Sequence, residues 1–218
     1  MEIKLVKDIL AANEAIAAQN RALFSEKGVY VVNLMGSPGA GKTTLLERTI
    51  EGLKGKRRMA VIEGDIATSR DAERIAAHSI QAVQINTGGE CHLDGNMVRG
   101  GLEQLNFDGI ELLVVENVGN LVCPAEFNIG EDAKVMICSV TEGDDKPLKY
   151  PLMFQVSSVL LLNKIDLLPH VSFDLDRFRA DALKVNPRLE IMPLSCSTGE
   201  GLGNWLQWLE ESSATQGV

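Results

Sequence analysis

The residues with the clearest chemical potential lie in one glycine-rich segment that directly follows an apolar run. Its sequence, Gly-Ser-Pro-Gly-Ala-Gly-Lys-Thr over residues 36–43, fits the phosphate-binding pattern GxxxxGK[ST]. In this pattern backbone N–H groups surround the phosphates, Lys42 reaches the β and γ oxygens, and the Thr43 hydroxyl binds Mg²⁺. The helix expected after the loop directs its positive end at the anion. We therefore expect nucleoside triphosphate contacts from Gly36, Ser37, Gly39, Ala40, Gly41, Lys42, Thr43 and Thr44.

A second motif indicates which base is bound. Asn163, Lys164 and Asp166 form the pattern NKxD directly after the apolar run Leu-Leu-Leu. The Asp166 carboxylate can accept the N–H groups of guanine N1 and N2, a pair that adenine does not present. Ser195 and Cys196 follow another predicted strand and are expected to complete the base loop. The motif favours GTP and GDP, whereas a P-loop kinase or ATPase that acts on a small molecule would prefer ATP.

Acidic residues follow two further strands, where a P-loop NTPase holds its metal and its γ-phosphate switch. Asp65 ends the second strand, and Glu116 ends an apolar run and precedes Gly119 by three residues. The alternative for either acid is a helix cap or a solvated loop charge. We expect a catalytic role for Lys42, Asp65, Glu116 and Gly119, and Mg²⁺ binding by Thr43, Asp65 and Glu116. No glutamine directly follows Gly119, so slow hydrolysis is expected.

Cys91, His92 and Cys123 form a possible site for a transition metal. Two thiolates and an imidazole suit Zn²⁺ or Ni²⁺. Three ligands do not close a tetrahedral site, but a two-fold axis near them would bring the same residues from two copies together. The alternative is that the cysteines are small buried apolar residues, as expected for Cys138. Because Cys123 lies seven residues after Glu116, a metal bound there would respond to the γ-phosphate.

The elements that must position these residues alternate between apolar runs and helical segments. This alternation predicts an α/β P-loop NTPase fold, with a mainly parallel central sheet covered by helices on both faces and ligands at the carboxyl ends of the strands. An amphipathic helix is expected near the N-terminus, over residues 6–25, with Ile9, Ile16 and Leu23 spaced by seven. The expected strands are residues 29–35, 58–63, 82–85, 110–116, 134–140, 158–163 and 189–194.

Length and charge restrict the class of protein. A chain of 218 residues, 45% of them hydrophobic, can form one domain over residues 1–218, with the N-terminal helix within 1–27 and a frayed tail at 212–218. A net charge of −9 argues against nucleic-acid binding. No apolar run approaches the roughly 20 residues of a membrane span, and no secretory signal is evident. We expect a cytoplasmic protein whose four cysteines are thiols or metal ligands.

Together, the motifs resemble the HypB family, GTPases that assist nickel insertion into [NiFe]-hydrogenase. The most specific segments are Gly-Glu-Cys-His-Leu-Asp at 89–94 and Glu-Asn-Val-Gly-Asn-Leu-Val-Cys-Pro at 116–124. The resemblance implies a GTP-dependent homodimer, of the same class as the signal-recognition GTPases, with nickel or zinc bound by Cys91, His92 and Cys123 at the subunit interface. It also implies a HypA-type nickel metallochaperone and the hydrogenase large subunit as partners.

The chain also departs from related families. The urease GTPase UreG has a Cys-Pro-His motif, but Ala125 follows Cys123-Pro124 here, so HypB fits better. The Cys-x-x-Cys-Gly-Cys site and the histidine-rich tract of some HypB proteins are missing, so we expect neither tight nickel binding nor nickel storage. Ser37 and Pro38 replace the extra P-loop lysine of related dimeric ATPases, for which Lys146 or Lys149 of a partner could substitute. UreG-like delivery to urease, and a metal carrier in which the nucleotide is only structural, remain alternatives.

Overall fold

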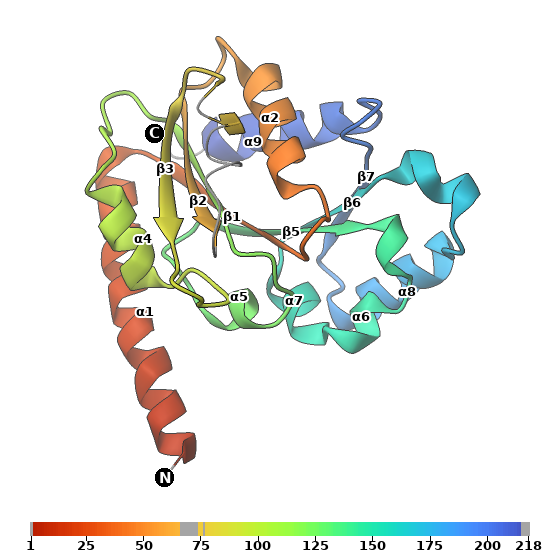
Figure 1. Ribbon diagram of the computed structural model, residues 1–218, viewed down its shortest axis with the longest axis horizontal. Helices are drawn as coiled ribbons and strands as arrows, with labels where there is room; N and C mark the ends of the chain where they lie inside the picture. The colour runs from red at the N-terminus through yellow and green to blue at the C-terminus, as the bar shows by residue number, and fades with distance from the viewer. Residues whose placement is uncertain (1, 66–73, 76, 215–218) are drawn as a thin grey trace.

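A parallel sheet of seven strands forms the centre of the protein (Figure 1). The computed structural model describes residues 2–65, 74–75 and 77–214, and it describes side chains from residue 8 onward. The strand order is β3-β2-β4-β1-β5-β6-β7, and every pairing between neighbours is parallel. The strands are β1 (Tyr30–Gly36), β2 (Met59–Asp65), β3 (Gln81–Asn86), β4 (Leu112–Glu116), β5 (Ala133–Ser139), β6 (Val159–Asn163) and β7 (Glu190–Pro193).

The sheet confirms the predicted fold class, and each predicted strand is present with its ends within two residues of the expected positions. The prediction succeeds because a parallel sheet covered on both faces gives nearly continuous apolar runs. In β1, Val31 packs on one side with Val115 of β4, while Val32 and Leu34 pack on the other side with Val135. All seven strands end at the same edge of the sheet, so the loops that follow them are brought together there.

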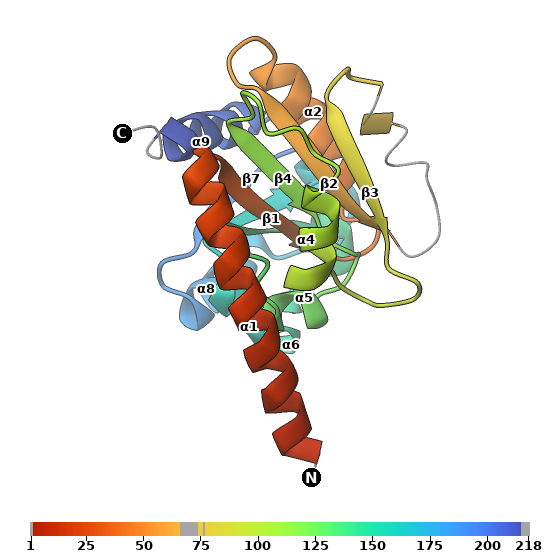
Figure 2. The ribbon, with the colours of Figure 1, turned by 90° about the vertical axis from the view of Figure 1, so that its left-hand side faces the viewer.

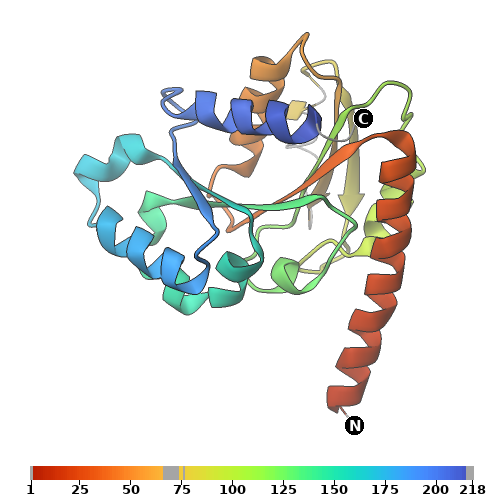
Figure 3. The same ribbon diagram turned by 180° about the vertical axis from the view of Figure 1, so that it is seen from behind.

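Helices cover both faces of the sheet (Figures 1 and 3). On one face, Leu45 of α2 and Trp205 of α9 join the strand side chains in one core. On the other face, Phe24 of α1 and Val98 of α4 form a second core, and Phe178 of α8 contributes to a third. The elements are α1 (Glu2–Lys27), α2 (Lys42–Leu53), α4 (Gly95–Leu102), α5 (Cys123–Glu126), η1 (Val140–Glu142), α6 (Lys146–Lys149), α7 (Pro151–Val156), η2 (Ile165–His170), α8 (Leu175–Val185) and α9 (Leu202–Ala214).

The first helix is longer than the predicted range 6–25, and it packs beside α4 while its first turns extend beyond the sheet (Figure 2). Asn20 is fully buried and donates hydrogen bonds to the carbonyls of Gly95 and Ile129. Asn13 accepts from the backbone N–H of Gly95. Of the three residues spaced by seven, Ile9 is 50% exposed, whereas Leu23 is partly buried against the core that contains Phe24 and Val98.

At the other end of the chain, α9 continues through Ala214, so the first three residues of the expected frayed tail are helical. Residues 215–218 of that tail lie outside the described residues. None of the described helices combines the length and the apolar character that a membrane span requires.

Candidate functional site

The glycine-rich loop joins β1 to α2 and forms one wall of a cavity of about 530 Å³. Gly36 is the last residue of β1, where a Cβ atom would collide with the carbonyl oxygen of Ile137. Gly41 directly precedes α2 and has a φ of 105°, a left-handed conformation that favours glycine. The loop therefore depends on glycine at both ends, and α2 begins with its N-terminus at the cavity.

The cavity brings together many of the residues predicted from the sequence. Those among its lining are Gly39, Gly41, Lys42, Thr43, Thr44, Asp65, Glu116, Gly119 and Lys164. The other predicted contacts are not among the lining residues, namely Gly36, Ser37, Ala40, Asn163, Asp166, Ser195 and Cys196. Ser37 donates a short hydrogen bond to Glu142 of η1, which fixes the start of the loop.

Two buried side chains of α2 carry the functional groups of the loop. The Lys42 ammonium lies 3.4 Å from the carbonyl oxygen of Gly36 and 3.3 Å from that of Ser37, so it is held over the loop. The Thr43 hydroxyl donates to Glu116 Oε1 at 3.1 Å. Thr43 and Glu116, together with Asp65 at the end of β2, present only oxygen ligands, the type that Mg²⁺ prefers.

Glu63 is an acidic residue of the cavity to which the sequence analysis gave no role. It is 2% exposed and pairs in register with Glu116 on the neighbouring strand β4. Side chains alternate along a strand, so Glu63 and Asp65 point to the same face of β2. Because Glu63 lies two residues before the predicted metal ligand Asp65, its place in the cavity could have been predicted from the sequence. Arg74 also lines the cavity and pairs with Glu47 at 2.6 Å, and no sequence pattern indicated this.

The NKxD segment, predicted to bind the base, also supports the phosphate loop. The Asn163 side chain donates to the carbonyl of Ala40 at 2.9 Å, and the Lys164 ammonium donates to that of Gly39 at 2.7 Å. Asp166, in η2, has a buried Oδ1 atom that finds no hydrogen-bond partner among the described residues. Buried carboxylate oxygens without a partner are rare, so this atom is available to accept a hydrogen bond from a ligand.

The predicted base loop lies beside Asp166. The Cys196 backbone N–H donates to Asn163 Oδ1 at 3.1 Å, and the Ser195 hydroxyl accepts from the Thr198 backbone N–H. Both residues are buried. Burial raises the pKa of the Cys196 thiol to about 11, so this cysteine is neutral at physiological pH.

The three predicted metal ligands meet at the same edge of the sheet. One ligand atom each of Cys91, His92 and Cys123 lies within 4.8 Å of the others, and all three residues are half-buried. The two sulfur atoms are 3.0 Å apart without a disulfide bond. Cys123 opens the short helix α5, whereas Cys91 and His92 lie in the loop that joins β3 to α4. The fold therefore assembles a ligand set from segments that are far apart in the sequence.

The surroundings of this cluster favour the neutral forms of Cys123 and His92 and orient the His92 ring. The hydrogen bond with Cys91 raises the pKa of the Cys123 thiol, and burial lowers the pKa of His92. The ring of Phe127 packs against the His92 ring with 4.0 Å between the centroids. Sequence reasoning missed Phe127, since an aromatic residue after a short helix is not by itself a signal. A neutral imidazole binds a metal directly, but each thiol must first lose its proton.

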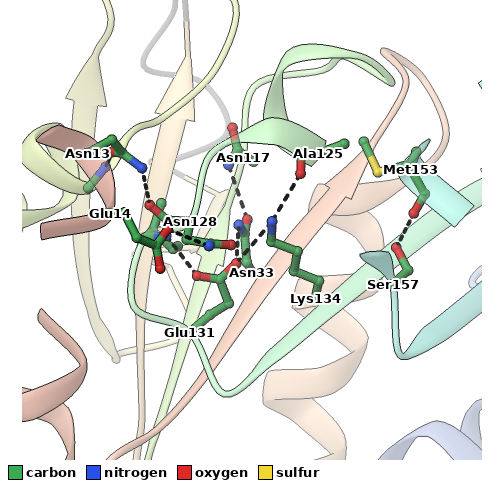
Figure 4. A network of polar contacts seen from close by, with 12 residues as sticks. Asn13, Glu14, Asn33, Asn117, Ala125, Asn128, Glu131, Lys134, Met153 and Ser157 are labelled. Atoms are coloured by element: carbon green, nitrogen blue, oxygen red, sulfur yellow. Dashed lines mark hydrogen bonds and ion pairs between the residues drawn. The ribbon is translucent and has the colours of Figure 1, made fainter. Parts of the chain in front are cut away.

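A buried polar network runs from Asn117, which lines the cavity, to the Ala125 carbonyl of α5 (Figure 4). Asn117, which follows Glu116, accepts from the Leu93 backbone N–H at 2.9 Å and donates to Asn33 at 3.1 Å. Asn33 in turn donates to Glu131, which lies 3.7 Å from the Lys134 ammonium. Burial lowers the pKa of Lys134, whose ammonium donates to the Ala125 carbonyl of α5 at 3.1 Å.

Lys146 and Lys149, which were considered as replacements for a P-loop lysine, both form ion pairs within the chain. Lys146 lies 3.6 Å from Glu142 and over the ring of Tyr150, while Lys149 pairs with Asp145. The Lys146 pair lies close to the phosphate loop, because Glu142 accepts the hydrogen bond from Ser37. A reach toward a partner's nucleotide would require either pair to break, and this role stays a prediction.

Comparison with known proteins identifies relatives along nearly the whole chain. Residues 30–193 match the family model described as CobW/HypB/UreG, nucleotide-binding domain. The hydrogenase maturation factor HypB of Azotobacter vinelandii is 53% identical over 98% of this chain and 71% of its own length. The hydrogenase/urease maturation factor HypB of Helicobacter pylori is 37% identical over 96% of this chain and 88% of its own length.

A solved structure agrees with these sequence relatives. The crystal structure of HypB from Helicobacter pylori in complex with nickel superposes with a TM-score of 0.90 at 35% identity, covering 94% of this chain and 96% of that one. The resemblance to the HypB family that the sequence motifs indicated is confirmed, because the fold, the family model and the relatives agree. The chain belongs to the HypB family of hydrogenase maturation factors, within the CobW/HypB/UreG group of P-loop nucleotide-binding proteins.

Proposed function

We propose that this chain is a GTP-hydrolysing nickel metallochaperone of [NiFe]-hydrogenase maturation, in which the bound nucleotide controls the affinity for nickel. The observation that carries this proposal is the joint placement of two sites at one edge of the sheet. The cavity at the phosphate loop and the Cys91, His92 and Cys123 cluster share the segment 116–123. A change at the cavity can therefore reach the metal ligands through one short stretch of chain.

Asp166 supports guanine as the base. Its buried Oδ1 atom, which has no hydrogen-bond partner among the described residues, can accept from guanine N1–H or N2–H. Adenine offers no such pair of donors on that edge, so binding ATP would leave the carboxylate unsatisfied. Asn163 and Lys164, which hold the phosphate loop, then fix the base and the phosphates relative to each other.

The cavity residues supply what phosphoryl transfer to water requires. In the proposed reaction a water oxygen attacks the γ-phosphorus, and the bond to the β–γ bridging oxygen breaks to give GDP and phosphate. Lys42 and the backbone N–H groups of the loop offset the charge on the phosphate oxygens. Thr43, Asp65 and Glu116 would hold Mg²⁺, which neutralises charge on the β and γ oxygens when it is bound. Gly119 would contact the γ-phosphate through its backbone.

The ligand set supports nickel or zinc as the metal that the cluster binds. Two sulfur atoms and one imidazole are soft or intermediate ligands, which favour Ni²⁺ and Zn²⁺ over Mg²⁺. We propose nickel as the physiological cargo, because the family serves hydrogenase maturation and a relative has been crystallised with nickel. Zinc is the competing occupant of the same ligands.

Two features support a homodimer with the metal site at its interface. Cys91, His92 and Cys123 provide three ligands, which leaves room for ligands from a second copy. Val122, directly before Cys123, is 52% exposed, and Leu148 and Leu152 on α6 and α7 are also exposed. Covering such side chains is favourable on association. A HypA-type nickel metallochaperone and the hydrogenase large subunit are the proposed donor or acceptor of the metal.

The proposal is tested by measuring phosphate release from GTP and ATP, together with nickel content and mass by native mass spectrometry. Wild type, His92→Ala and the control His170→Ala are compared, because His170 is an exposed histidine away from the cluster. We expect slow phosphate release from GTP only, and nickel-bound dimers that His92→Ala loses and His170→Ala keeps. Absence of GTP hydrolysis in every metal state would contradict the proposal and favour a carrier in which the nucleotide is structural.

A second function is favoured by one comparison. The Helicobacter pylori relative, at 37% identity, is a hydrogenase/urease maturation factor. Nickel delivery to urease is therefore a further candidate for this chain. Nickel transfer to apo-urease in the presence of its accessory proteins, at a rate that depends on the bound nucleotide, would support this second function.

A further inference from the structure

The proposed nickel ligands Cys91, His92 and Cys123 do not line the nucleotide cavity, yet one stretch of chain touches both sites. Asn117, Val118 and Gly119 line the cavity. Gly119 lies so close to the phosphate loop that a Cβ atom on it would be 2.9 Å from Pro38 Cγ and 3.0 Å from Pro38 N. Asparagines lie directly before and directly after the pair Val118-Gly119, at positions 117 and 120. A shift of this stretch toward a γ-phosphate would move both asparagines.

Asn120 connects the phosphate loop to both cysteine segments. Its backbone N–H donates to the Gly36 carbonyl at 3.0 Å, where the two residues form an isolated antiparallel bridge. Its side-chain Nδ2 donates to the Cys91 carbonyl at 3.1 Å. Its Oδ1 accepts from the Val122 backbone N–H at 2.9 Å, one residue before Cys123. One amide side chain therefore fixes the distance between the two strand-end loops that carry the metal ligands.

Asn117 makes a second, fully buried connection. Its Oδ1 accepts from the backbone N–H groups of Leu93 and Val118, so it joins the cavity wall to the residue after His92. Its Nδ2 donates to Asn33, from which the contacts continue through Glu131 and Lys134 to the Ala125 carbonyl in α5 (Figure 4). Both metal-ligand segments are thus tied to the same residue beside the cavity.

We propose that Asn117 and Asn120 are the positioning residues through which the nucleotide state sets the geometry of the metal ligands; this inference rests on the proposed control of nickel affinity by nucleotide. An asparagine amide donates and accepts at once, so it can fix two backbone segments relative to each other where an apolar residue cannot. When the Val118-Gly119 stretch moves, the Cys91 and Cys123 segments move with it. Nickel affinity then differs between the nucleotide states, as linkage requires.

The test compares nickel dissociation constants with GDP and with a non-hydrolysable GTP analogue in wild type, Asn120→Ala and Asn120→Asp. Asn120 is half-buried, so its replacement is less disruptive than that of the fully buried Asn117. The aspartate variant keeps the acceptor for Val122 and loses the donor to Cys91. We expect the ratio of the two dissociation constants to fall about fivefold in both variants, the effect of one hydrogen bond that differs between states. Nucleotide affinity and melting temperature are measured alongside.

Asn128→Ala is the matched control. Asn128 follows α5 in the same region and also makes a side-chain hydrogen bond, to Glu14, but it does not join the two cysteine segments. It should keep the wild-type ratio. An unchanged ratio in the Asn120 variants, or equal weakening of nickel binding in both nucleotide states, would overturn the inference. Equal nickel dissociation constants in the two nucleotide states of wild type would instead contradict the proposed function. The failure of the inference and the failure of the proposed function are therefore distinguishable.

Discussion

At the scale of single residues, we propose that one carboxylate, that of Asp166, determines selectivity for the base. Asp166 Oδ1 is buried, and it has no hydrogen-bond partner among the described residues, whereas neighbouring Asn163 and Lys164 are occupied by contacts to the phosphate loop. The proposed base recognition by Asp166 and the support of the phosphate loop by Asn163 and Lys164 use different side chains, so mutation can alter one without the other. A side chain that only stabilised the loop would not distinguish guanine from adenine.

We predict that Asp166→Asn weakens GDP and GTP-analogue binding about 10- to 100-fold, because a charge-assisted hydrogen bond contributes about 1.5–3 kcal/mol and the amide replaces one acceptor oxygen by a donor NH₂ group. Xanthosine nucleotides, which replace the N2 amino group by a carbonyl, should bind the variant better than wild type. Isothermal calorimetry measures both. Asp176→Asn, in the first turn of α8, is the control. Wild-type affinity for GDP in Asp166→Asn would contradict this role.

The metal ligands predict how nickel binding depends on pH. The pKa of the Cys123 thiol is raised by its hydrogen bond with Cys91, so the thiol is protonated near neutral pH and must release a proton to bind nickel. The pKa of His92 is lowered by burial, so this ring is already neutral and contributes little above its ordinary range. Nickel affinity should therefore rise with pH, by up to about tenfold per pH unit for each thiol proton released.

Competition with a nickel-binding dye between about pH 6 and about pH 8 measures this dependence. Calorimetry in two buffers of different ionisation enthalpy counts the protons released on binding. An affinity that stays flat or falls over this range would contradict thiolate ligation by Cys91 and Cys123.

At the scale of elements, the contact between the phosphate loop and the stretch after β4 depends on a glycine. Gly119 does not have a positive φ, so alanine fits its backbone, but the added Cβ would lie 2.9 Å from Pro38 Cγ. A proline ring cannot rotate away as a long side chain can. Either the loop or the 118–120 segment must therefore shift.

We predict that Gly119→Ala weakens binding of a non-hydrolysable GTP analogue about tenfold, since overpacking typically costs about 1–3 kcal/mol, while GDP binding changes less. Gly100→Ala in α4 is the control, because nothing lies within 4 Å of a Cβ atom there. Alanine in a helix interior should raise the stability of that control by about 0.5–1 kcal/mol. Equal losses for GDP and the analogue in Gly119→Ala would exclude a γ-phosphate contact at this position.

The elements were predictable from the sequence to a larger extent than the contacts between them. The strands were predictable because burial on both faces of the sheet leaves apolar runs in the sequence. The candidate nucleotide- and metal-binding residues were predictable because Lys42, Asp166 and Cys91 belong to specific motifs. The hydrogen bonds of Asn117 and Asn120 join segments 24 and 29 residues apart. No local pattern specifies such pairs, because they depend on which strand ends the fold brings together.

At the scale of the whole molecule, nucleotide control of nickel requires that binding at one site change the free energy of binding at the other. The nucleotide cavity and the metal cluster lie at the same sheet edge, and exposed Val122 lies beside the cluster on a surface that a second copy could cover. Assembly of two copies would place both clusters at one interface, where nucleotide-dependent movement changes the ligands of both. The coupling must act in both directions, because linkage between binding sites is reciprocal.

The most direct test is a nickel titration of the wild-type protein with GDP and with a non-hydrolysable GTP analogue, followed by the reciprocal nucleotide titration with and without nickel. We predict nickel affinities that differ about 5- to 150-fold between nucleotide states, with the same factor in the reciprocal experiment. Equal nickel affinities in the two nucleotide states would show that the nucleotide does not control the metal site.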